Sequence, residues 1–242
     1  MMFDRTHTLY IFGSLFVTLL LLYGAHRAFK REHTKLKFLR FFALSTVILH
    51  ISPMWLTYLE SSNNYGFVYD NVLFPIHFCN LAMYCLLVAA YLKPKTVVHQ
   101  TFMSFTAWAG IFGGLISLFY PVYYLGQPSI FEWMVLKSML SHSTLLIGSL
   151  YLILGGFVKI NRWNLRDFSI GLIDVLFVGI FNNALLGYYG KNINSMFLKE
   201  PPIQGVFWLN FLTMPLMVLI IMFVVIVIKE KRMATTTEAV VT

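Results

Sequence analysis

Charged residues are scarce in this sequence. They make up 12% of its 242 residues, whereas 58% of the residues are hydrophobic. A typical soluble domain has roughly 25% charged residues, because charged side chains must cover its surface. The mean hydropathy of +0.72 agrees with this imbalance. So little charge excludes an ordinary soluble enzyme and indicates an integral, multi-pass membrane protein.

Cysteine is also rare, and only Cys79 and Cys85 are present. On one predicted helix they would be separated by about 9 Å of rise, beyond the roughly 7 Å Cα separation that a disulfide tolerates. The sequence therefore predicts no bridge between them. It also contains no H-x-x-x-H, no C-x-x-C and no glycine-rich phosphate loop, so we expect no metal and no cofactor. The run GIFGGL is instead typical of close helix packing.

No long polar region is present that could form a separate soluble domain. At about 20 residues per span, six to eight helices would use the whole chain. Apolar runs bounded by charged, Gly/Pro or Asn/Ser clusters predict seven spans. Their ranges are 8–26, 38–60, 71–92, 99–121, 132–157, 165–188 and 206–228. The predicted fold is all-α, a seven-helix transmembrane bundle over residues 1–228, with a basic and then polar, disordered tail over 229–242.

Lysine and arginine are distributed unevenly between the two sides of these spans. One side carries 14 of them: Arg27, Lys30, Arg31, Lys35, Lys37, Arg40, Lys93, Lys95, Lys159, Arg162, Arg166, Lys229, Lys231 and Arg232. The other side carries three, Arg5, Lys191 and Lys199. The positive-inside rule then places the N-terminus outside and the C-terminus in the cytoplasm. Because these charges lie at span ends rather than along one face, we expect no nucleic-acid binding.

Polar side chains recur at one predicted depth in the outer half of the bundle. At about 1.5 Å per residue, Cys79 of the third span and His142 of the fifth lie roughly 12–15 Å from the outer surface. His50 of the second span lies near the same depth, and Asn182 and Asn183 of the sixth lie about 8 Å below the surface. Because polar groups are costly in hydrocarbon, the shared depth suggests a partly hydrated cavity. Such residues also hydrogen-bond between helices in bundles without chemistry, and that alternative stays open.

The fifth span has a one-sided polar face. At 100° per residue, Lys137, Ser138, Ser141 and His142 lie within an arc of about 140°. Ser138, one turn before His142, is placed to hydrogen-bond the imidazole ring and set its orientation. Lys137 is close enough to the outer surface that we expect its side chain to snorkel outward.

The run FPIHFCNL concentrates unusual residues near the start of the third span. Pro75 fits the first turn of a helix, where a missing N–H is tolerated. On a helix, His77 and Cys79 would point about 200° apart, so His142 is a better candidate base for Cys79 than His77 is. Asn80 is placed to hydrogen-bond across helices or to stabilise developing negative charge.

Two further residues have competing interpretations. Cys85 has no histidine at matching depth, and a buried cysteine usually acts as a small apolar residue, so we interpret it as structural. Asp174 is the only mid-span carboxylate. An intramembrane acid is a functional candidate by default, but Asp174 lies too far toward the cytoplasmic side to join the outer polar layer.

Three motifs carry a resemblance to a known family. PIHFCNL at the head of the third of seven spans, SHSTLL on the fifth and NSMFLKEP after the sixth resemble the YwaF / transmembrane protein 164 family, over nearly the whole chain. Members of that family are described as membrane acyltransferases that move fatty acyl chains onto lysophospholipids with a cysteine and a histidine. The resemblance implies that Cys79 is the acyl-carrying nucleophile and His142 the base. The third motif differs from the family pattern, because Asn194 is followed by Ser195 instead of the expected tyrosine.

The predicted function is therefore transfer of a fatty acyl chain from a lipid donor to a lysophospholipid-type acceptor through a thioester on Cys79. A buried thiol needs a base or a nearby cation to ionise. Some of the 23 Phe and 12 Met residues would line a slot for the acyl chain. The residues predicted to support the reaction are Asn80, Ser138, Ser141, His50, His77, Asn182, Asn183 and Asn194. The predicted location is a prokaryotic cytoplasmic membrane.

Two other functions stay open. A seven-helix transporter or receptor-like protein would bind a small ligand in the outer cavity without covalent chemistry, and Asp174 could then serve as a coupling residue. A structural membrane subunit would need no ligand at all. Replacement of Cys79 by serine separates these functions from a thioester enzyme, since only the enzyme requires the thiol.

Overall fold

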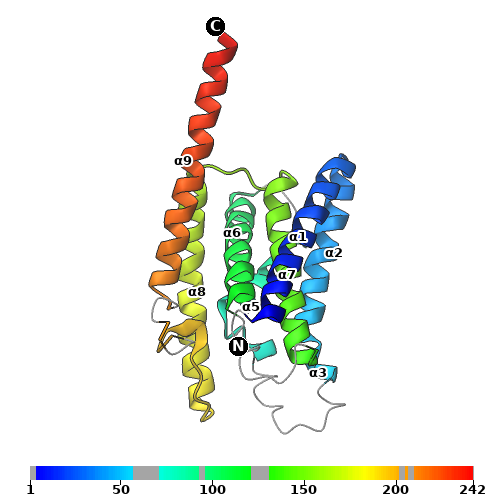
Figure 1. The fold of residues 1–242 in the computed structure, drawn as a ribbon. Helices are drawn as coiled ribbons and strands as arrows, with labels where there is room; N and C mark the ends of the chain where they lie inside the picture. Colours follow the sequence, from blue (N-terminus) through cyan, green and yellow to red (C-terminus); the bar gives the residue numbers. More distant parts are fainter. Residues whose placement is uncertain are drawn as a thin grey trace.

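The computed structural model describes residues 4–56, 71–92, 96–120, 131–201, 205–206 and 210–241. Within these ranges the chain is all helical and has no strands (Figure 1). The elements are α1 (Arg5–Ala28), α2 (Glu32–Ile51), α3 (Pro53–Leu56), α5 (Phe78–Tyr91), α6 (Val97–Phe119), α7 (Trp133–Leu154), α8 (Trp163–Tyr188), the short 3-10 helix η1 (Ser195–Phe197) and α9 (Thr213–Val241).

Five segments are long and apolar enough to cross a membrane. They are Arg5–Ala28, Glu32–Trp55, Val97–Phe119, Trp163–Tyr188 and Thr213–Met233. The α7 helix has 22 residues but carries the polar face described above, and α5 has only 14 residues. The multi-pass helical architecture is thus confirmed, whereas the count of seven spans stays a prediction. The same holds for the side of the membrane on which each terminus lies.

Side chains from neighbouring segments satisfy several helix ends. Asp4 and Thr96 cap the starts of α1 and α6, where their side chains accept hydrogen bonds from the backbone N–H groups of His7 (2.8 Å) and His99 (3.0 Å). At the other ends, Lys35 donates to the carbonyl of Gly155 and Arg40 to that of Ala90. Basic residues of α2 thereby close the last turns of α7 and α5.

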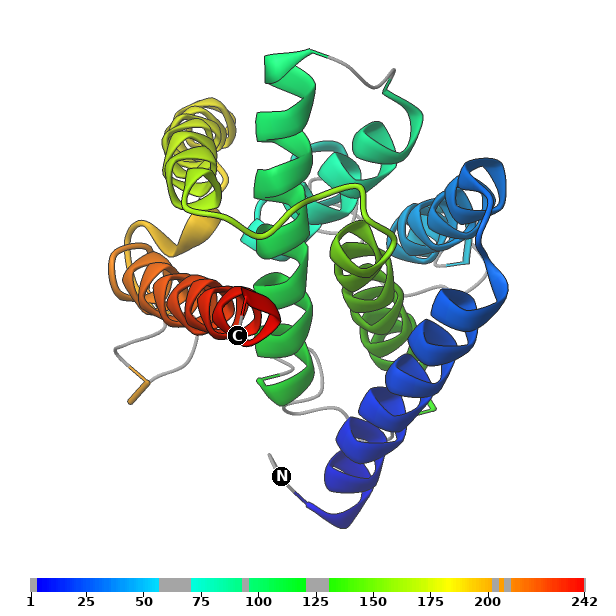
Figure 2. The ribbon, with the colours of Figure 1, turned by 90° about the horizontal axis from the view of Figure 1, so that it is seen from above.

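The α6 helix lies at the centre of the bundle. In Figure 2, α8 and α9 lie on one side of α6 and α7 lies on the other, with α1 and α2 farther out beyond α7. Three glycines allow this close approach. A β-carbon on Gly113 would lie 3.4 Å from Cys79 Cα of α5, one on Gly114 would lie 3.1 Å from the carbonyl oxygen of His142, and Gly110 packs against Ser149 of α7. The prediction that GIFGGL is a helix-packing motif is confirmed.

The third predicted span differs from the structure at its start. The sequence predicts a helix over 71–92 with Pro75 in its first turn, but α5 begins at Phe78 with His77 as an extended N-cap residue. Pro75 therefore precedes the helix. The residue before a proline favours an extended backbone, and the carbonyl groups of Pro75 and Ile76 accept hydrogen bonds from other parts of the chain, which stabilises an extended segment here.

The last helix also extends further than the sequence predicts. Disorder is predicted from Lys229 onward, whereas α9 is helical from Thr213 to Val241. Lys229 donates a hydrogen bond to the carbonyl of Ile160 (2.7 Å), and Glu230 forms an ion pair with Arg162 (2.8 Å). These contacts tie the first turn beyond the predicted span to the start of α8.

Candidate functional site

Four titratable side chains lie within electrostatic reach of Lys137, near the start of α7. The Lys137 side chain is only 4% exposed, so the prediction that it snorkels outward is wrong. Its ammonium group lies within electrostatic reach of Cys79 and of His77, His142 and His50. We call these five residues the polar layer. They come from α2, α5, α7 and the segment before α5, so four parts of the chain bring titratable groups within electrostatic reach of one another.

Within the polar layer, a backbone hydrogen bond fixes which ring nitrogen of His142 carries the proton. Its Nδ1 lies 2.5 Å from the carbonyl oxygen of Ser138 and 3.5 Å from the Ser138 hydroxyl. A carbonyl oxygen can only accept, so Nδ1 carries the hydrogen and Nε2 of the neutral ring has a lone pair. Among the residues that the structure describes, this buried Nε2 has no hydrogen-bond partner. The predicted orienting role of Ser138 thus belongs mainly to its carbonyl group.

Cys79 lies in the first turn of α5 and is half-buried and unbridged. Its thiol donates to Asn80 Oδ1 (3.6 Å), and Asn80 Nδ2 donates to Asn71 Oδ1 (2.7 Å). Ser117 of α6 lies within hydrogen-bonding reach of the sulfur. Since Gly113 contacts Cys79 and Gly114 contacts the backbone of His142, adjacent residues of α6 hold both at one level.

The extended segment before α5 is held by side chains of α8 and η1. Asn182 Nδ2 donates to the carbonyl of Pro75 (3.2 Å) and to the hydroxyl of Ser195 (3.3 Å), which in turn donates to the carbonyl of Ile76 (3.0 Å). Asn183 accepts a hydrogen bond from the backbone N–H of Ser195 (2.9 Å). We call this set of contacts the asparagine clasp. It fixes the backbone that leads directly into His77 and Cys79.

The remaining predicted residues have local roles. The hydroxyl of Ser141 donates to the carbonyl of Ser138 (2.9 Å), within the same helix. Asn194 bonds the backbone of Lys199 (2.9 Å) and Glu200 (2.6 Å), so it closes a turn rather than reaching the polar layer. The His77 ring stacks on Phe197 of η1, with ring centres 5.2 Å apart, and His50 packs edge-on against Tyr84.

A comparison with protein families assigns the chain to a family. The profile of the TMEM164 family matches residues 2–229, nearly the whole chain and all of the elements that form the polar layer. The chain belongs to the TMEM164 family. No curated protein and no solved structure gives a significant match. With five segments able to cross a membrane, it is a multi-pass membrane protein of this family.

In this TMEM164-family protein an apolar groove begins at Phe78, the residue before Cys79. It runs from Phe78 of α5 past α6 and α8 to η1 and the start of α9, and its free volume in this conformation is about 30 Å³. Its lining includes Phe112, Phe168, Met196 and Met214. Phe197, which stacks on His77, also lines it, so the groove and the polar layer share a wall.

Sequence reasoning missed Lys137 and Ser195 as members of the site. The one-sided polar face of the fifth span was the signal for Lys137, but a helix pattern does not say which neighbour covers a side chain. Asp174 lies away from the site, exposed on α8 on the same side as Ile173 and Phe177, although it is within electrostatic reach of Cys85. Cys85 is buried in the main apolar core, in agreement with its structural interpretation.

Proposed function

We propose that this TMEM164-family protein is a membrane acyltransferase that carries a fatty acyl chain as a thioester on Cys79 and passes it to a lysophospholipid-type acceptor. The observation that carries the proposal is that Cys79 belongs to the polar layer while its neighbour in the chain, Phe78, lines the apolar groove. A thiol there has a cation within electrostatic reach, a candidate base at the same level of the bundle, and an apolar wall that an acyl chain would widen. The prokaryotic cytoplasmic membrane remains the predicted location.

The first half of the reaction forms the thioester. The Cys79 thiol gives its proton to His142 Nε2 while the sulfur attacks the carbonyl carbon of the donor ester. The ester C–O bond breaks, and the proton passes from Nε2 to the departing oxygen. Lys137 stabilises the thiolate and the transient oxyanion, because a fixed cation in a low-dielectric site favours developing negative charge.

The second half returns the enzyme to its starting state. The hydroxyl of the acceptor gives its proton to Nε2, and its oxygen attacks the thioester carbonyl carbon. The C–S bond breaks and the proton returns to the sulfur. His142 suits both steps because the Ser138 carbonyl keeps its other nitrogen protonated.

The apolar groove would hold the acyl chain after the side chains that line it move apart, since its free volume in this conformation is about 30 Å³. Its lining is almost entirely aromatic and aliphatic, and Met196 and Met214 have flexible side chains that adapt to different chain lengths. The groove starts at Phe78, next to Cys79 along the chain, so a chain lying in it would present its carbonyl end near the sulfur.

The proposal is tested by trapping the thioester. Purified protein incubated with phospholipid vesicles or an activated acyl donor should acquire an acyl group that neutral hydroxylamine releases. Cys79→Ala should abolish this label, whereas the matched variant Cys85→Ala should retain it. His142→Ala should slow labelling by about 100-fold, the usual size of a general acid–base contribution. A folded protein that never carries a hydroxylamine-labile group, or a label that persists in Cys79→Ala, would overturn the proposal.

The binding-protein alternative gains no specific support from the described residues. Asp174, the residue that suggested a coupling role, is exposed on α8 instead of facing the polar layer. Should Cys79→Ser bind a small polar ligand as the unmodified protein does, without any acyl intermediate in either, that alternative would replace the enzyme.

A further inference from the structure

A second, polar pocket lies at the opposite end of α6 from Cys79. It is formed by the first turns of α6 and α8 and by the loop that follows α7, and its volume is about 440 Å³. Ser104 lines this pocket and Ser117 lies beside Cys79; on one helix they are about 20 Å apart along the axis. The polar pocket is therefore separate from the proposed acyl-transfer site.

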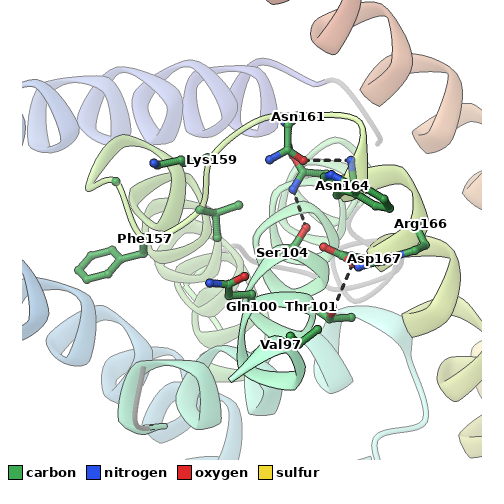
Figure 3. A pocket seen from close by; sticks show the side chains of 13 residues that line it. Val97, Gln100, Thr101, Ser104, Phe157, Lys159, Asn161, Asn164, Arg166 and Asp167 are labelled. Atoms are coloured by element: carbon green, nitrogen blue, oxygen red, sulfur yellow. Dashed lines mark hydrogen bonds and ion pairs between the residues drawn. The ribbon is translucent and has the colours of Figure 1, made fainter. Parts of the chain in front are cut away.

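Hydrogen bonds fix the wall of the polar pocket. Asn164 Nδ2 donates to Ser104 Oγ (2.8 Å), and the backbone N–H of Asn161 donates to Asn164 Oδ1 (2.8 Å). The hydroxyl of Thr101 donates to Asp167 Oδ1 (3.2 Å). These residues line one side of the space in Figure 3, with Phe157 and Lys159 across from them. The wall thus joins α6 and α8 before any ligand arrives.

The unbalanced charge of the polar pocket is positive. Its carboxylate, Asp167, is buried and paired with Arg166 at 2.9 Å. Lys159 has no ion pair or hydrogen bond within the part of the chain that the structure describes, and it lines the pocket with an exposed side chain. Val97 brings the start of α6 to the pocket, and the N-terminal end of a helix carries partial positive charge.

Residues typical of the membrane–water interface border the polar pocket. Trp163 lines it with a side chain that is 64% exposed, and the guanidinium of Arg166 lies 4.7 Å from the centre of that ring. Tryptophan and arginine together are typical of the membrane–water interface. In the predicted orientation α6 and α8 begin at the cytoplasmic surface, so this is the interface of the cytoplasmic leaflet.

We propose that the polar pocket binds the phosphate group of an anionic ligand, supplied by a lipid headgroup of that leaflet or by a soluble phosphate ester. Basic residues gather at this side of membrane proteins for insertion alone. Insertion does not require a hydrogen-bonded cavity with its one acidic group neutralised, and that cavity is what favours a ligand. The proposal does not rest on the acyl-transfer reaction.

The test measures binding to purified, full-length protein in an uncharged detergent at constant ionic strength. The probes are glycerol 3-phosphate, dihexanoyl phosphatidylglycerol and, as the phosphate-free control, dihexanoylglycerol. Saturable increases in melting temperature give a Kd, and native mass spectrometry counts the bound molecules. We expect at least one phosphate probe to bind, and dihexanoylglycerol not to bind.

Three variants assign the binding to the pocket. Lys159→Gln should weaken binding by about tenfold, since it removes a charged hydrogen-bond donor, and Lys159→Arg should restore most of it. Lys37→Gln removes the same charge from an exposed residue on the same predicted side, outside the pocket, and should leave the Kd unchanged.

Each outcome of the binding test either supports or overturns the proposal. Binding of glycerol 3-phosphate supports a soluble ligand, and binding of the phosphatidylglycerol alone supports a headgroup. Absence of saturable binding by both phosphate probes overturns the proposal. It is likewise overturned when dihexanoylglycerol binds as tightly as the phosphate probes, or when Lys37→Gln weakens binding as much as Lys159→Gln.

Discussion

At the scale of single residues, the site depends on which neighbour covers each polar group. His142 shows this best, because one backbone carbonyl fixes its tautomer and leaves Nε2 available inside the bundle. Lys137, by contrast, is covered where its position in the sequence predicts an exposed side chain. A lysine near a span end ordinarily snorkels, yet this one is buried within electrostatic reach of Cys79 and three histidines. A buried cation is costly unless it is paired, and the proposed reaction uses its position within electrostatic reach of Cys79.

The first prediction concerns Lys137 and the reactivity of the Cys79 thiol. A nearby ammonium group stabilises the thiolate, which is the form that reacts. In a Cys85→Ala background, Lys137→Met should therefore slow alkylation of Cys79 by a small maleimide at neutral pH by about tenfold. Lys137→Arg keeps the charge and should retain a rate within a few-fold of the parent protein.

Comparing Lys137→Met with Lys137→Arg separates the effect of the charge on Cys79 from the effect of altered packing. Both variants are first checked by thermal unfolding, since a loosened bundle would expose Cys79 and speed alkylation instead. If Lys137→Met, folded like its parent, reacts at the parental rate, Lys137 does not influence the thiol, and its part in the proposed reaction must be abandoned.

At the scale of elements, the third predicted span shows that hydrophobic periodicity alone does not predict where a helix starts. The apolar pattern places a helix over 71–92, and its C-terminal limit agrees with α5, which ends at Tyr91. Its start does not, because the asparagine clasp takes up the carbonyl groups of Pro75 and Ile76. Those partners come from α8 and η1, over a hundred residues later in the chain. Asn182 and Asn183 were found from their depth alone, but their function as a clasp depends on tertiary contacts.

The second prediction concerns the packing of α6. A β-carbon on Gly114 would lie 3.1 Å from both the carbonyl oxygen of His142 and Leu146 Cβ, so α7 must shift to accept it. Overpacking of this kind costs about 1–3 kcal/mol. Gly114→Ala should therefore lower the melting temperature in detergent by several degrees and slow acyl labelling, because the shift moves the backbone of His142.

Gly13→Ala is the matched control for this substitution. Gly13 lies inside α1, and a β-carbon there would meet nothing within 4 Å. The control should melt at the same temperature as the parent or slightly higher, since alanine favours helix more than glycine does. Equal melting temperatures and labelling rates for the two variants would contradict the close packing of α6 against α7 at the polar layer.

At the scale of the whole molecule, the sequence predicts the helices well and their contacts poorly. Charged and Gly/Pro clusters mark the ends of α6, α7 and α8 to within a few residues, because each end is a local property of the chain. The central place of α6 and the position of the apolar groove are not local properties. They depend on which glycines of one helix face which backbone of another. The common depth of Cys79 and His142 could be predicted, and the burial of a lysine within electrostatic reach of both could not.

The third prediction concerns the orientation of the bundle in the membrane. Consecutive helices alternate in direction, so the turn between α1 and α2 and the turn after α8 lie at opposite ends (Figure 1). The uneven distribution of Lys and Arg assigns the first turn to the cytoplasm and the second to the outside. In a Cys79→Ala, Cys85→Ala background, an impermeant maleimide should label Asn192→Cys on intact cells. It should label Arg31→Cys only after the membrane is permeabilised, since both positions are exposed. If Arg31→Cys alone is labelled on intact cells, the orientation is the reverse of the predicted one. The polar pocket would then lie at the outer leaflet and Cys79 in the cytoplasmic half of the membrane.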